Sequence, residues 1–533
     1  MPPQHADAHP ADAHPADAHP ADAHPAATRH AEQGGAIRTA RIVIIGAGFS
    51  GIGMAIRLRQ RGITDFVILE RADALGGTWR DNSYPGCACD VQSTLYSFSF
   101  APNPEWSSTF APQPEIWAYL RRCVQTFDIG RHIVFGQNIT GAAWHDDAQR
   151  WTVTTTTHTW HATIMVAANG PLSDPITPSL AGLDTFRGPA FHSAQWQHDV
   201  DLRGKHIAVI GTGASAIQFV PHIQPLVQQL DIYQRTPPWI MPRHDRAVPA
   251  WRHRLYRTLP FTQRAHRAAL YALRELTFVP FRHPRIAHAA QRLATRHLHA
   301  QVRDTTLRAQ LTPSYTIGCK RILLSDTYYP ALTQPNVALI TDRIAHIGAD
   351  RIVTDHVASD HGAQRTHTPR RADVIIFGTG FRATDPPLAP CITGRDGRSL
   401  AESWQGSPKA YMGTTEAGFP NLFFLLGPNT GLGHNSVLLI VEAQIEHVLG
   451  VLALMDERHA GAIEPTEAAQ RAYVQWIDER LAATVWNRGG CHSWYLDDTG
   501  RNSTLWPERV GRFRHTVARV RADDYRSMPR VGA

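Results

Sequence analysis

Lysine is almost missing from this chain, which has only three, at positions 205, 320 and 409. Arginine therefore supplies nearly all of the positive charge, and the formal net charge is +7. This excess is spread along the chain and not gathered in one run, so we expect no nucleic-acid partner. A dispersed positive charge is compatible with anionic small ligands such as nucleotide phosphates.

Cysteine is also scarce, with six residues in a chain of 533 and no spacing typical of a secreted disulfide framework. We therefore expect reduced, partly buried thiols, a cytoplasmic protein and no metal site. Cys87 and Cys89 form a CxC pair, which is not the CxxC or CxxxxC that a dithiol–disulfide reductase places beside its flavin.

Uninterrupted apolar runs are short. The longest apolar stretch begins at Val437 and is broken by Glu442, Gln444, Glu446 and His447. It predicts an amphipathic helix and not a membrane span. The first residues do not combine a charged segment with an apolar one, so no signal peptide is indicated.

A low-complexity segment opens the chain. Residues 6–25 repeat Ala-Asp-Ala-His-Pro four times, with no bulky apolar side chain to pack. We predict a disordered tail over residues 1–37, in preference to a weak metal-binding role for its histidines.

Two similar patterns of strand, glycine turn and helix organise the rest. The first is ARIVIIGAGFSGIGMAIRLRQRG from Ala40, followed by the strand FVILE; the second is KHIAVIGTGASAIQFVPHI from Lys205, followed by LDIYQR. Such patterns are typical of βαβ units. Because they lie far apart and a further strand, RADVIIFGTGFRATD, follows, we predict an α/β fold of two interleaved, doubly wound, Rossmann-like dinucleotide-binding domains.

The first glycine turn predicts an FAD site. Gly46, Gly48 and Gly51 form a GxGxxG between the predicted strand and helix. Glycines at this spacing let a helix N-terminus approach a pyrophosphate closely. Glu70 ends the next strand, where a carboxylate accepts hydrogen bonds from ribose hydroxyls.

The second glycine turn predicts an NADPH site. It reads Gly211-x-Gly213-x-x-Ala216, and Arg235, not a carboxylate, stands after the next strand. A cation at this position suits a 2′-phosphate, which a carboxylate would repel.

From these units we expect three ordered parts. They are the first part of the FAD-binding domain at 38–180, the NADP-binding domain at 181–371 with a helical insert at about 243–312, and a return to the FAD-binding domain with a helical and active-site loop region at 372–533.

Two further motifs carry a family resemblance. GGTWRDNSYPGCACD matches Gly-x-Trp, four residues, aromatic-Pro-Gly, three residues, Asp; FRGPAFHSAQW matches F-x-G-x-x-x-H-x-x-x-W. On these motifs the chain resembles the flavin-dependent monooxygenases, and among them the Baeyer–Villiger type. Gln197 departs from the Pro or Asp that usually follows the second motif. The matching residues are Gly77, Trp79, Tyr84, Pro85, Gly86 and Asp90 in the first motif and Phe186, Gly188, His192 and Trp196 in the second.

The resemblance extends along most of the ordered chain. Similar segments are YQRTPPWI from Tyr233, GCKRILLSDTYYP from Gly318, FGTGFRATD from Phe377, GFPNLFFLLGPNTGLGHNS from Gly418 and CHSWYLDDTGRNSTLWP from Cys491. It implies FAD contacts by Gly46, Gly48, Phe49, Ser50, Gly51, Glu70, Gly77, Thr78, Trp79, Asp90 and Tyr96, and NADP contacts by Gly211, Thr212, Gly213, Ala214, Ser215, Ala216, Arg235, Thr236, Lys320, Arg321 and Trp494.

The resemblance also implies a reaction. Oxygen would be inserted beside a ketone carbonyl through a C4a-peroxyflavin, giving an ester or lactone. Arg321 would stabilise the anions that form, because a guanidinium stays protonated and forks two hydrogen bonds, and Asp90 would orient it.

Other roles and functions stay open from the sequence. We expect Phe186, Gly188, His192 and Trp196 to form an interdomain linker, with proton transfer by His192 as the lesser possibility, and Asp326, Tyr328 and Tyr329 to be structural. The alternative functions are oxidation of N or S heteroatoms by a related flavin-containing monooxygenase, a dithiol reductase, and a non-catalytic flavoprotein. The ketone and the oligomeric state are not predicted.

Overall fold

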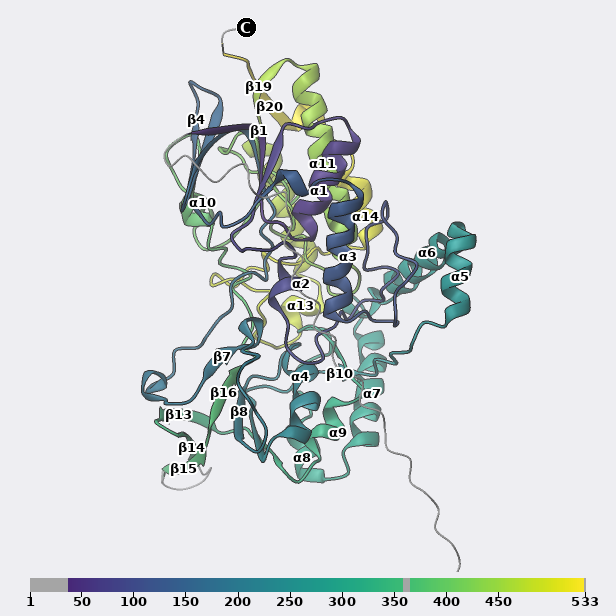
Figure 1. Ribbon diagram of the computed structural model, residues 1–533, viewed down its shortest axis with the longest axis vertical. Helices are drawn as coiled ribbons and strands as arrows, with labels where there is room; N and C mark the ends of the chain where they lie inside the picture. The colour runs from purple at the N-terminus through teal and green to yellow at the C-terminus, as the bar shows by residue number, and fades with distance from the viewer. Residues whose placement is uncertain (1–36, 358–364, 532–533) are drawn as a thin grey trace, which may run out of the picture.

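The computed structural model describes residues 37–357 and 365–531. The predicted N-terminal tail therefore lies, except for its last residue, outside the described residues. Two sheets dominate the fold: the first lies in the upper half of Figure 1 and the second in the lower half, with the helices α5 and α6 projecting to one side.

The first sheet is built around β1 (Arg38–Ile45), which pairs in parallel with β2 (Phe66–Leu69) on one side and β6 (Thr159–Ala167) on the other. The last four residues of β1 are buried on both faces, as expected for a central parallel strand. The strand order is β17-β4-β5-β6-β1-β2-β3, with β18 paired to β6. The other strands are β3 (Ile133–Val134), β4 (Ile139–His145), β5 (Arg150–Thr155), β17 (Ile392–Thr393) and β18 (Leu422–Phe424).

Helices cover the first sheet. α1 and α11 contact each other, and α11 also contacts α14 (Figure 1). These helices are α1 (Phe49–Gln60), α2 (Thr78–Asp81), α3 (Gln113–Thr126), α11 (Leu438–Glu457) and α14 (Val510–Val517).

The helix α11 differs from the predicted amphipathic helix. It is buried over most of its circumference and not on one face only, and His447 and Gln444 are fully buried with it. By length and composition it is apolar enough to cross a membrane, but 78% of its apolar window is buried inside the protein. It is a core helix of the first domain.

The second sheet has the order β12-β9-β8-β16-β7, and all of its pairs are parallel. Together the two sheets confirm the predicted α/β fold with two dinucleotide-binding units. The strands and helices of this unit are β7 (Ala190–His192), β8 (His206–Ile210), β9 (Gln229–Tyr233), β12 (Val337–Ile340), β16 (Val374–Phe377), α4 (Ala216–Ile223) and α9 (Tyr328–Leu332).

Two details of the second unit differ from the sequence-based prediction. The strand β16, which was assigned to the first domain, pairs with β7 and β8 in the second sheet, so the return begins after Phe377 and not at 372. Part of the stretch predicted to be an interdomain linker is a strand, because β7 completes the edge of that sheet.

The insert is helical as predicted, and small elements complete the chain. An antiparallel sheet of β13, β14 and β15 was not foreseen. The remaining helices are α5 (Ala250–Thr258), α6 (Pro260–Leu276), α7 (Pro284–Gln301), α8 (Thr305–Gln310), α10 (Leu400–Trp404), α12 (Glu467–Leu481) and α13 (Val485–Arg488); the remaining strands are β10 (Ile240–Met241), β11 (Leu323–Leu324), β13 (Arg343–Gly348), β14 (Arg351–Val357), β15 (Arg365–Arg371), β19 (Ala460–Pro465) and β20 (Tyr525–Pro529); the 3₁₀ turns are η1 (Gly130–His132), η2 (Leu183–Thr185), η3 (Ser193–Gln195), η4 (Gln224–Leu226), η5 (Val279–Phe281), η6 (Ala389–Cys391) and η7 (Ala522–Asp524).

Candidate active site

The first glycine turn joins β1 to α1 with very little space to spare. Gly46 has a φ of +101°, and a Cβ on Gly51 would lie 1.9 Å from the Gly46 carbonyl oxygen. Gly48 and Gly77 face each other across a narrow gap. A Cβ on Gly77 would lie 3.2 Å from the Gly48 Cα. No side chain caps the N-terminus of α1, so its first amide groups are available to a ligand.

Glu70 lies directly beside this turn and is buried. Its Oε2 accepts a hydrogen bond from the Ala47 amide at 2.8 Å, and its Oε1 accepts from the Ala72 amide and from Arg80 Nη1, both at 3.0 Å. The carboxylate is therefore fixed at the strand end where the sequence predicts contacts with a ribose.

The turn opens into a cavity of about 630 Å³. Gly51 and Asp90 do not line it, because Gly51 packs against the turn and Asp90 lies behind Arg321. The predicted residues that do line the cavity are Gly46, Gly48, Phe49, Ser50, Glu70, Gly77, Thr78, Trp79, Tyr96, Arg321 and Trp494.

Arg321 and Asp90, 231 residues apart, form a bidentate ion pair at this cavity. Arg321 Nε donates to Asp90 Oδ2 at 2.9 Å, and Nη2 donates to Oδ1 at 2.8 Å and to Oδ2 at 2.6 Å. The charge of Asp90 raises the pKa of Arg321 despite burial. Burial acts to raise the pKa of Asp90, but the charge and hydrogen bonds of Arg321 hold it below its ordinary value. Both groups are therefore charged near neutral pH.

A third residue of this cluster was missed by the sequence analysis. Arg274, from the insert helix α6, donates from Nη2 to the Asp90 carbonyl at 3.1 Å and from Nε to Gln92 Oε1 at 2.9 Å. Burial lowers its pKa, and Asp90 opposes that effect. Arg274 stands in an arginine-rich helix, so no spacing in the sequence distinguished it from its neighbours.

Other cavity-lining residues were also missed. Many come from the ends of the first sheet's strands and from the segment after β16, where the residues follow no fixed spacing that predicts a ligand. They include residues 137–139, 168–174, 382–383 and 386–389.

The second glycine turn joins β8 to α4. Gly211 has a φ of +103°, and a Cβ there would lie 2.5 Å from the Gly378 carbonyl oxygen, which follows β16. Thr212 is buried, whereas Gly213 and Ala214 are exposed. Ser215 makes no capping hydrogen bond to α4, so this helix also presents free N-terminal amides.

Arg235, which follows strand β9, acts electrostatically on Lys320. Arg235 is exposed. Burial and then the charge of Arg235 lower the pKa of Lys320, whose Nζ lies 5.2 Å from the centre of the Tyr315 ring. Two like charges that repel each other in this way would both be stabilised by a phosphate. Thr236 follows Arg235 and is half-buried.

The second family motif, FRGPAFHSAQW at residues 186–196, lies partly in the second sheet and partly next to it. A Cβ on Gly188 would lie 2.2 Å from the Asp373 carbonyl oxygen, so only glycine fits there. Trp196 packs against Phe191 of β7 and against Phe219 of α4, with ring centres 5.4 and 5.3 Å apart. Phe186 packs at the edge of the sheet's hydrophobic core.

His192 has the surroundings of a structural residue. Its Nδ1 accepts a hydrogen bond from the Ala194 amide at 3.1 Å, and its ring meets Phe381 edge-on at 5.6 Å. Burial lowers its pKa to about 4, although a backbone contact with Gly380 opposes this. The imidazole is neutral at physiological pH and does not line the cavity.

Three residues that follow Arg321 in the sequence were predicted to be structural, and each of them packs in the core or forms hydrogen bonds. Asp326 accepts from the amides of Arg243 and His244 at 2.9 and 2.8 Å. Tyr328 and Tyr329 are buried in the core.

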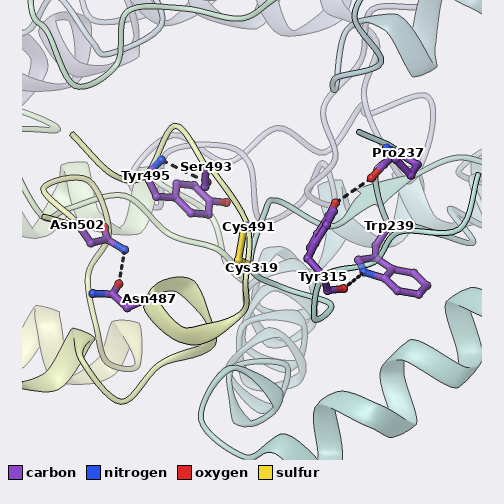
Figure 2. The surroundings of a disulfide bond; sticks show 9 residues. All are labelled: Pro237, Trp239, Tyr315, Cys319, Asn487, Cys491, Ser493, Tyr495 and Asn502. Carbon is purple, nitrogen blue, oxygen red and sulfur yellow. Dashed lines mark hydrogen bonds between the residues drawn. A yellow bond between two sulfur atoms is a disulfide. The ribbon is translucent and has the colours of Figure 1, made fainter. Parts of the chain in front are cut away.

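One prediction about the cysteines is wrong. Cys319 and Cys491, 172 residues apart, form a disulfide (Figure 2). The pairing was invisible in the sequence because it joins two segments that meet only in the folded chain.

The other cysteines do not support a dithiol reductase. Cys87 and Cys89 are unpaired and buried, and burial raises the pKa of Cys87 to about 12 and raises that of Cys89 as well. Both thiols therefore stay protonated and unreactive. Among the described residues no group of three or more His, Cys, Asp or Glu is placed to hold a metal ion.

Comparison with known proteins places this site in a family. The Flavin-binding monooxygenase-like family matches residues 39–261. The chain is 49% identical over 487 residues to a Baeyer–Villiger monooxygenase of Streptomyces coelicolor, covering 91% of this chain and 92% of that protein. It is also 49% identical over 493 residues to one of Pseudomonas aeruginosa, covering 92% of each.

Solved structures agree. A cyclohexanone monooxygenase from Rhodococcus sp. Phi1 bound to NADP+ matches with a TM-score of 0.82 and 28% identity, covering 93% of this chain and all of that one. A steroid monooxygenase bound to NADP matches with a TM-score of 0.80 and 31% identity, covering 92% of this chain and all of that one. These relatives favour oxygen insertion over heteroatom oxidation or a non-catalytic role. The chain belongs to the Baeyer–Villiger type of the flavin-dependent monooxygenases.

Proposed function

We propose that this enzyme uses FAD and NADPH to insert one atom of O₂ beside a ketone carbonyl, giving an ester or lactone, with Arg321 as the catalytic cation. The observation that carries the proposal is the bidentate Arg321–Asp90 pair at a cavity lined by the first glycine turn. Trp494, from a distant segment, lines the same cavity.

The residues of the first turn fit FAD. The uncapped N-terminus of α1 and the gap between Gly48 and Gly77 leave backbone amides and space for a pyrophosphate. Glu70 stands ready for a ribose hydroxyl. The cavity continues from there to Tyr96 and Arg321, which would border the flavin ring.

The residues of the second turn fit NADPH. Arg235 and Lys320 would hold its 2′-phosphate between two cations, with Thr236 beside them, and the uncapped α4 would face its pyrophosphate. Trp494 is 43% exposed and would border the nicotinamide.

Bound flavin, reduced by NADPH, supplies the chemistry that activates O₂. Arg321 would donate hydrogen bonds to the oxygen that becomes negative when the ketone carbonyl is attacked. A preorganised cation of this kind commonly contributes about 100- to 1000-fold in rate. Because its pKa is raised, Arg321 supplies positive charge and not a proton.

Asp90 and Arg274 would position Arg321. Asp90 Oδ1 and Oδ2 fix both the Nε and Nη2 groups, and Arg274 in turn holds the Asp90 carbonyl. The insert helix α6 is thereby connected to the reaction centre, and a change in its position would reach Arg321 through Asp90.

The proposed location is the cytoplasm. Burial of α11, which by length and composition could cross a membrane, supports this placement over a membrane-spanning one.

The direct test is oxygen uptake that depends on NADPH, rises on addition of a ketone and is matched by ester formed. Cyclohexanone and a steroid ketone begin the panel, because structural relatives are named for them. Product is identified by mass spectrometry, and a thioether and a tertiary amine are included. Oxidation of those heteroatom substrates with no ester from any ketone would overturn the proposal.

A further inference from the structure

The Cys319–Cys491 disulfide joins the two segments that bring Arg321 and Trp494 to the cavity. Cys319 is next to Lys320 and two residues before Arg321, and Cys491 is three residues before Trp494. The two Cα atoms are 6.2 Å apart (Figure 2). The bond therefore connects the cationic segment directly to the C-terminal loop.

On one side of the disulfide the chain is firmly held. Tyr315 donates from its hydroxyl to the Pro237 carbonyl at 3.1 Å, and its own carbonyl accepts from Trp239 Nε1 at 2.9 Å (Figure 2). These contacts tie the segment to the chain that follows Arg235. Gly318 has a φ of +91°, and a Cβ there would lie 2.8 Å from the Phe281 ring, so the turn before Cys319 is fixed by its packing.

On the other side the loop is anchored at its base. Asn502 donates to Asn487 at 3.1 Å, and Asp497 accepts from Ser407 at 2.7 Å. The hydrogen bonds of Ser493, by contrast, stay within the loop, to the amides of Tyr495 and Leu496.

The two sides touch closely at the disulfide. The Thr316 amide donates to the Gly489 carbonyl at 3.0 Å. A Cβ on Gly489 would lie 2.6 Å from Cys319 Cβ, so no side chain separates the two segments. The disulfide is the covalent tie between this segment and the loop that carries the exposed Trp494. The same loop is also held by Tyr495, which is buried and whose ring centre lies 4.6 Å from that of Trp494.

We propose that the Cys319–Cys491 disulfide is a positioning cross-link that holds Trp494 at the cavity beside Arg321, so that the thiol state of this pair sets how tightly the nicotinamide cofactor is held. The inference rests on the proposed roles of Arg321 and Trp494. It deepens that function by adding a redox-dependent control of cofactor binding.

Reduction of the pair would begin at Cys491, and Cys391 is the other described cysteine that is partly exposed. Cys491 is partly exposed while Cys319 is buried, so a reductant thiolate would attack at Cys491. Burial raises the pKa of Cys87 to about 12 and that of Cys123 to about 11, which keeps those thiols unreactive.

The redox step balances with simple reagents. A dithiol reductant attacks Cys491 Sγ, the S–S bond breaks, and Cys319 leaves as a thiolate that takes a proton. The second thiol of the reductant then releases Cys491, so two electrons and two protons pass to the protein and the reductant becomes a cyclic disulfide. In the reverse direction hydrogen peroxide oxidises the two thiols to the disulfide and is itself reduced to two molecules of water.

The test compares four samples of the full-length, FAD-loaded enzyme: oxidised, reduced with dithiothreitol, Cys491→Ser and Cys123→Ala. Cys123→Ala removes a different buried thiol and keeps the disulfide. NADP+ affinity is measured by titration, and amide exchange is followed over residues 489–496. We expect the NADP+ Kd to rise about 10-fold on reduction and in Cys491→Ser, with faster exchange in the loop, because the ordering of the loop is then lost.

The controls separate positioning from general stability. Cys123→Ala should bind NADP+ like the wild type and respond to dithiothreitol in the same way, whereas Cys491→Ser should not respond to it. KM for NADPH should rise in step with Kd, while kcat for flavin reduction at saturating NADPH changes by less than about 2-fold.

Several results would overturn the inference. One is an equal NADP+ Kd and equal loop exchange in oxidised and reduced enzyme; another is six free thiols that hydrogen peroxide does not pair. If Cys491→Ser fails to fold, the inference is tested by comparing the NADP+ Kd and the loop exchange of the oxidised and the reduced wild-type enzyme. The NADP+ titration and the amide-exchange measurement need neither ketone nor O₂. A failure to form ester would therefore contradict the proposed function and would not bear on the role of the disulfide.

Discussion

The two glycine turns of this chain share a backbone design but differ in how closed they are. In the first, Gly51 lies against the Gly46 carbonyl and the turn lines a cavity. In the second, Ala216 takes the place of the third glycine, and Gly213 and Ala214 are exposed.

The strand ends beside the two turns differ in charge and burial. Glu70 is buried and held by three hydrogen bonds, whereas Arg235 is exposed and lies near Lys320. A closed turn with a fixed carboxylate suits a resident cofactor. An open turn followed by an exposed arginine, with a lysine near it, suits one that binds and leaves.

Arg321 lines the cavity of the first turn, and removing it should have the largest effect. We expect Arg321→Ala to reduce ester formation about 1000-fold, because the cation at the attacked carbonyl is lost. NADPH should still reduce the flavin. Stopped-flow absorbance measures the reduction and gas chromatography the ester.

Arg257→Ala is the matched control, because Arg257 forms an exposed ion pair with Glu105 far from the cavity. It should leave ester formation unchanged. Ester yield in Arg321→Ala equal to that of the wild type would contradict the mechanism.

A substitution in the closed turn should come next. Gly51→Ala places a Cβ 1.9 Å from a carbonyl oxygen that cannot move away, so we expect FAD affinity to fall about 100-fold. Flavin absorbance after gel filtration measures it.

The second turn supplies the control for Gly51→Ala, because Ala216→Gly makes the reverse change. It should alter NADP+ affinity by less than about 3-fold. A fully flavin-loaded Gly51→Ala protein would show that the two turns do not differ as described.

A substitution beside the open turn should change the preference for NADPH over NADH and should not abolish binding of the nicotinamide cofactor. Arg235→Ala should raise KM for NADPH about 10-fold, since one charged hydrogen bond to the 2′-phosphate is lost, and leave KM for NADH nearly unchanged. Steady-state oxidation of the two cofactors measures it.

Arg351→Ala, which removes an exposed arginine paired with Asp350, is the control for Arg235→Ala. An equal rise in KM for NADPH and NADH would show that Arg235 does not bind the 2′-phosphate.

The smallest effect on activity concerns His192, the last residue of β7 in the second sheet. Its pKa falls from the ordinary 6.5 to about 4 in the folded protein. The unfolded chain therefore binds an extra proton between these values, and His192 makes the free energy of unfolding fall as pH decreases from 6.5 to 4. The limiting slope is about 1.4 kcal/mol per pH unit.

His192→Asn keeps an acceptor for the Ala194 amide and removes the titration. We expect a shallower slope of unfolding free energy with pH in that range, measured by urea denaturation, and an unchanged pH profile of ester formation near neutrality. If the pH profile of ester formation in His192→Asn instead lost one of its limbs, His192 would have a role in proton transfer.

The sequence predicted the fold and the part of the cavity formed by the first glycine turn because these depend on local spacing. A glycine turn between strand and helix, and the residue ending the next strand, are fixed within one βαβ unit. The family motifs also brought Asp90 and Arg321 into the prediction, although no spacing within the chain connects them.

Long-range contacts account for what was missed. The pairing of β16 with β7 and β8, the approach of Arg274 to Asp90, and the buried setting of α11 each depend on segments far apart in the chain. Arg274 lies in a helix with several arginines, and only tertiary packing selects the one that meets Asp90.

The sequence by itself therefore determined the two nucleotide units and the charge at the end of each, since both are local properties of strand, turn and helix. Only the tertiary structure decided that Arg321, paired with Asp90, and Trp494 line one cavity, and that Cys319 and Cys491 form a disulfide. The physical reason is that side chains hundreds of residues apart become neighbours only when both sheets are packed together, and no local pattern encodes that approach.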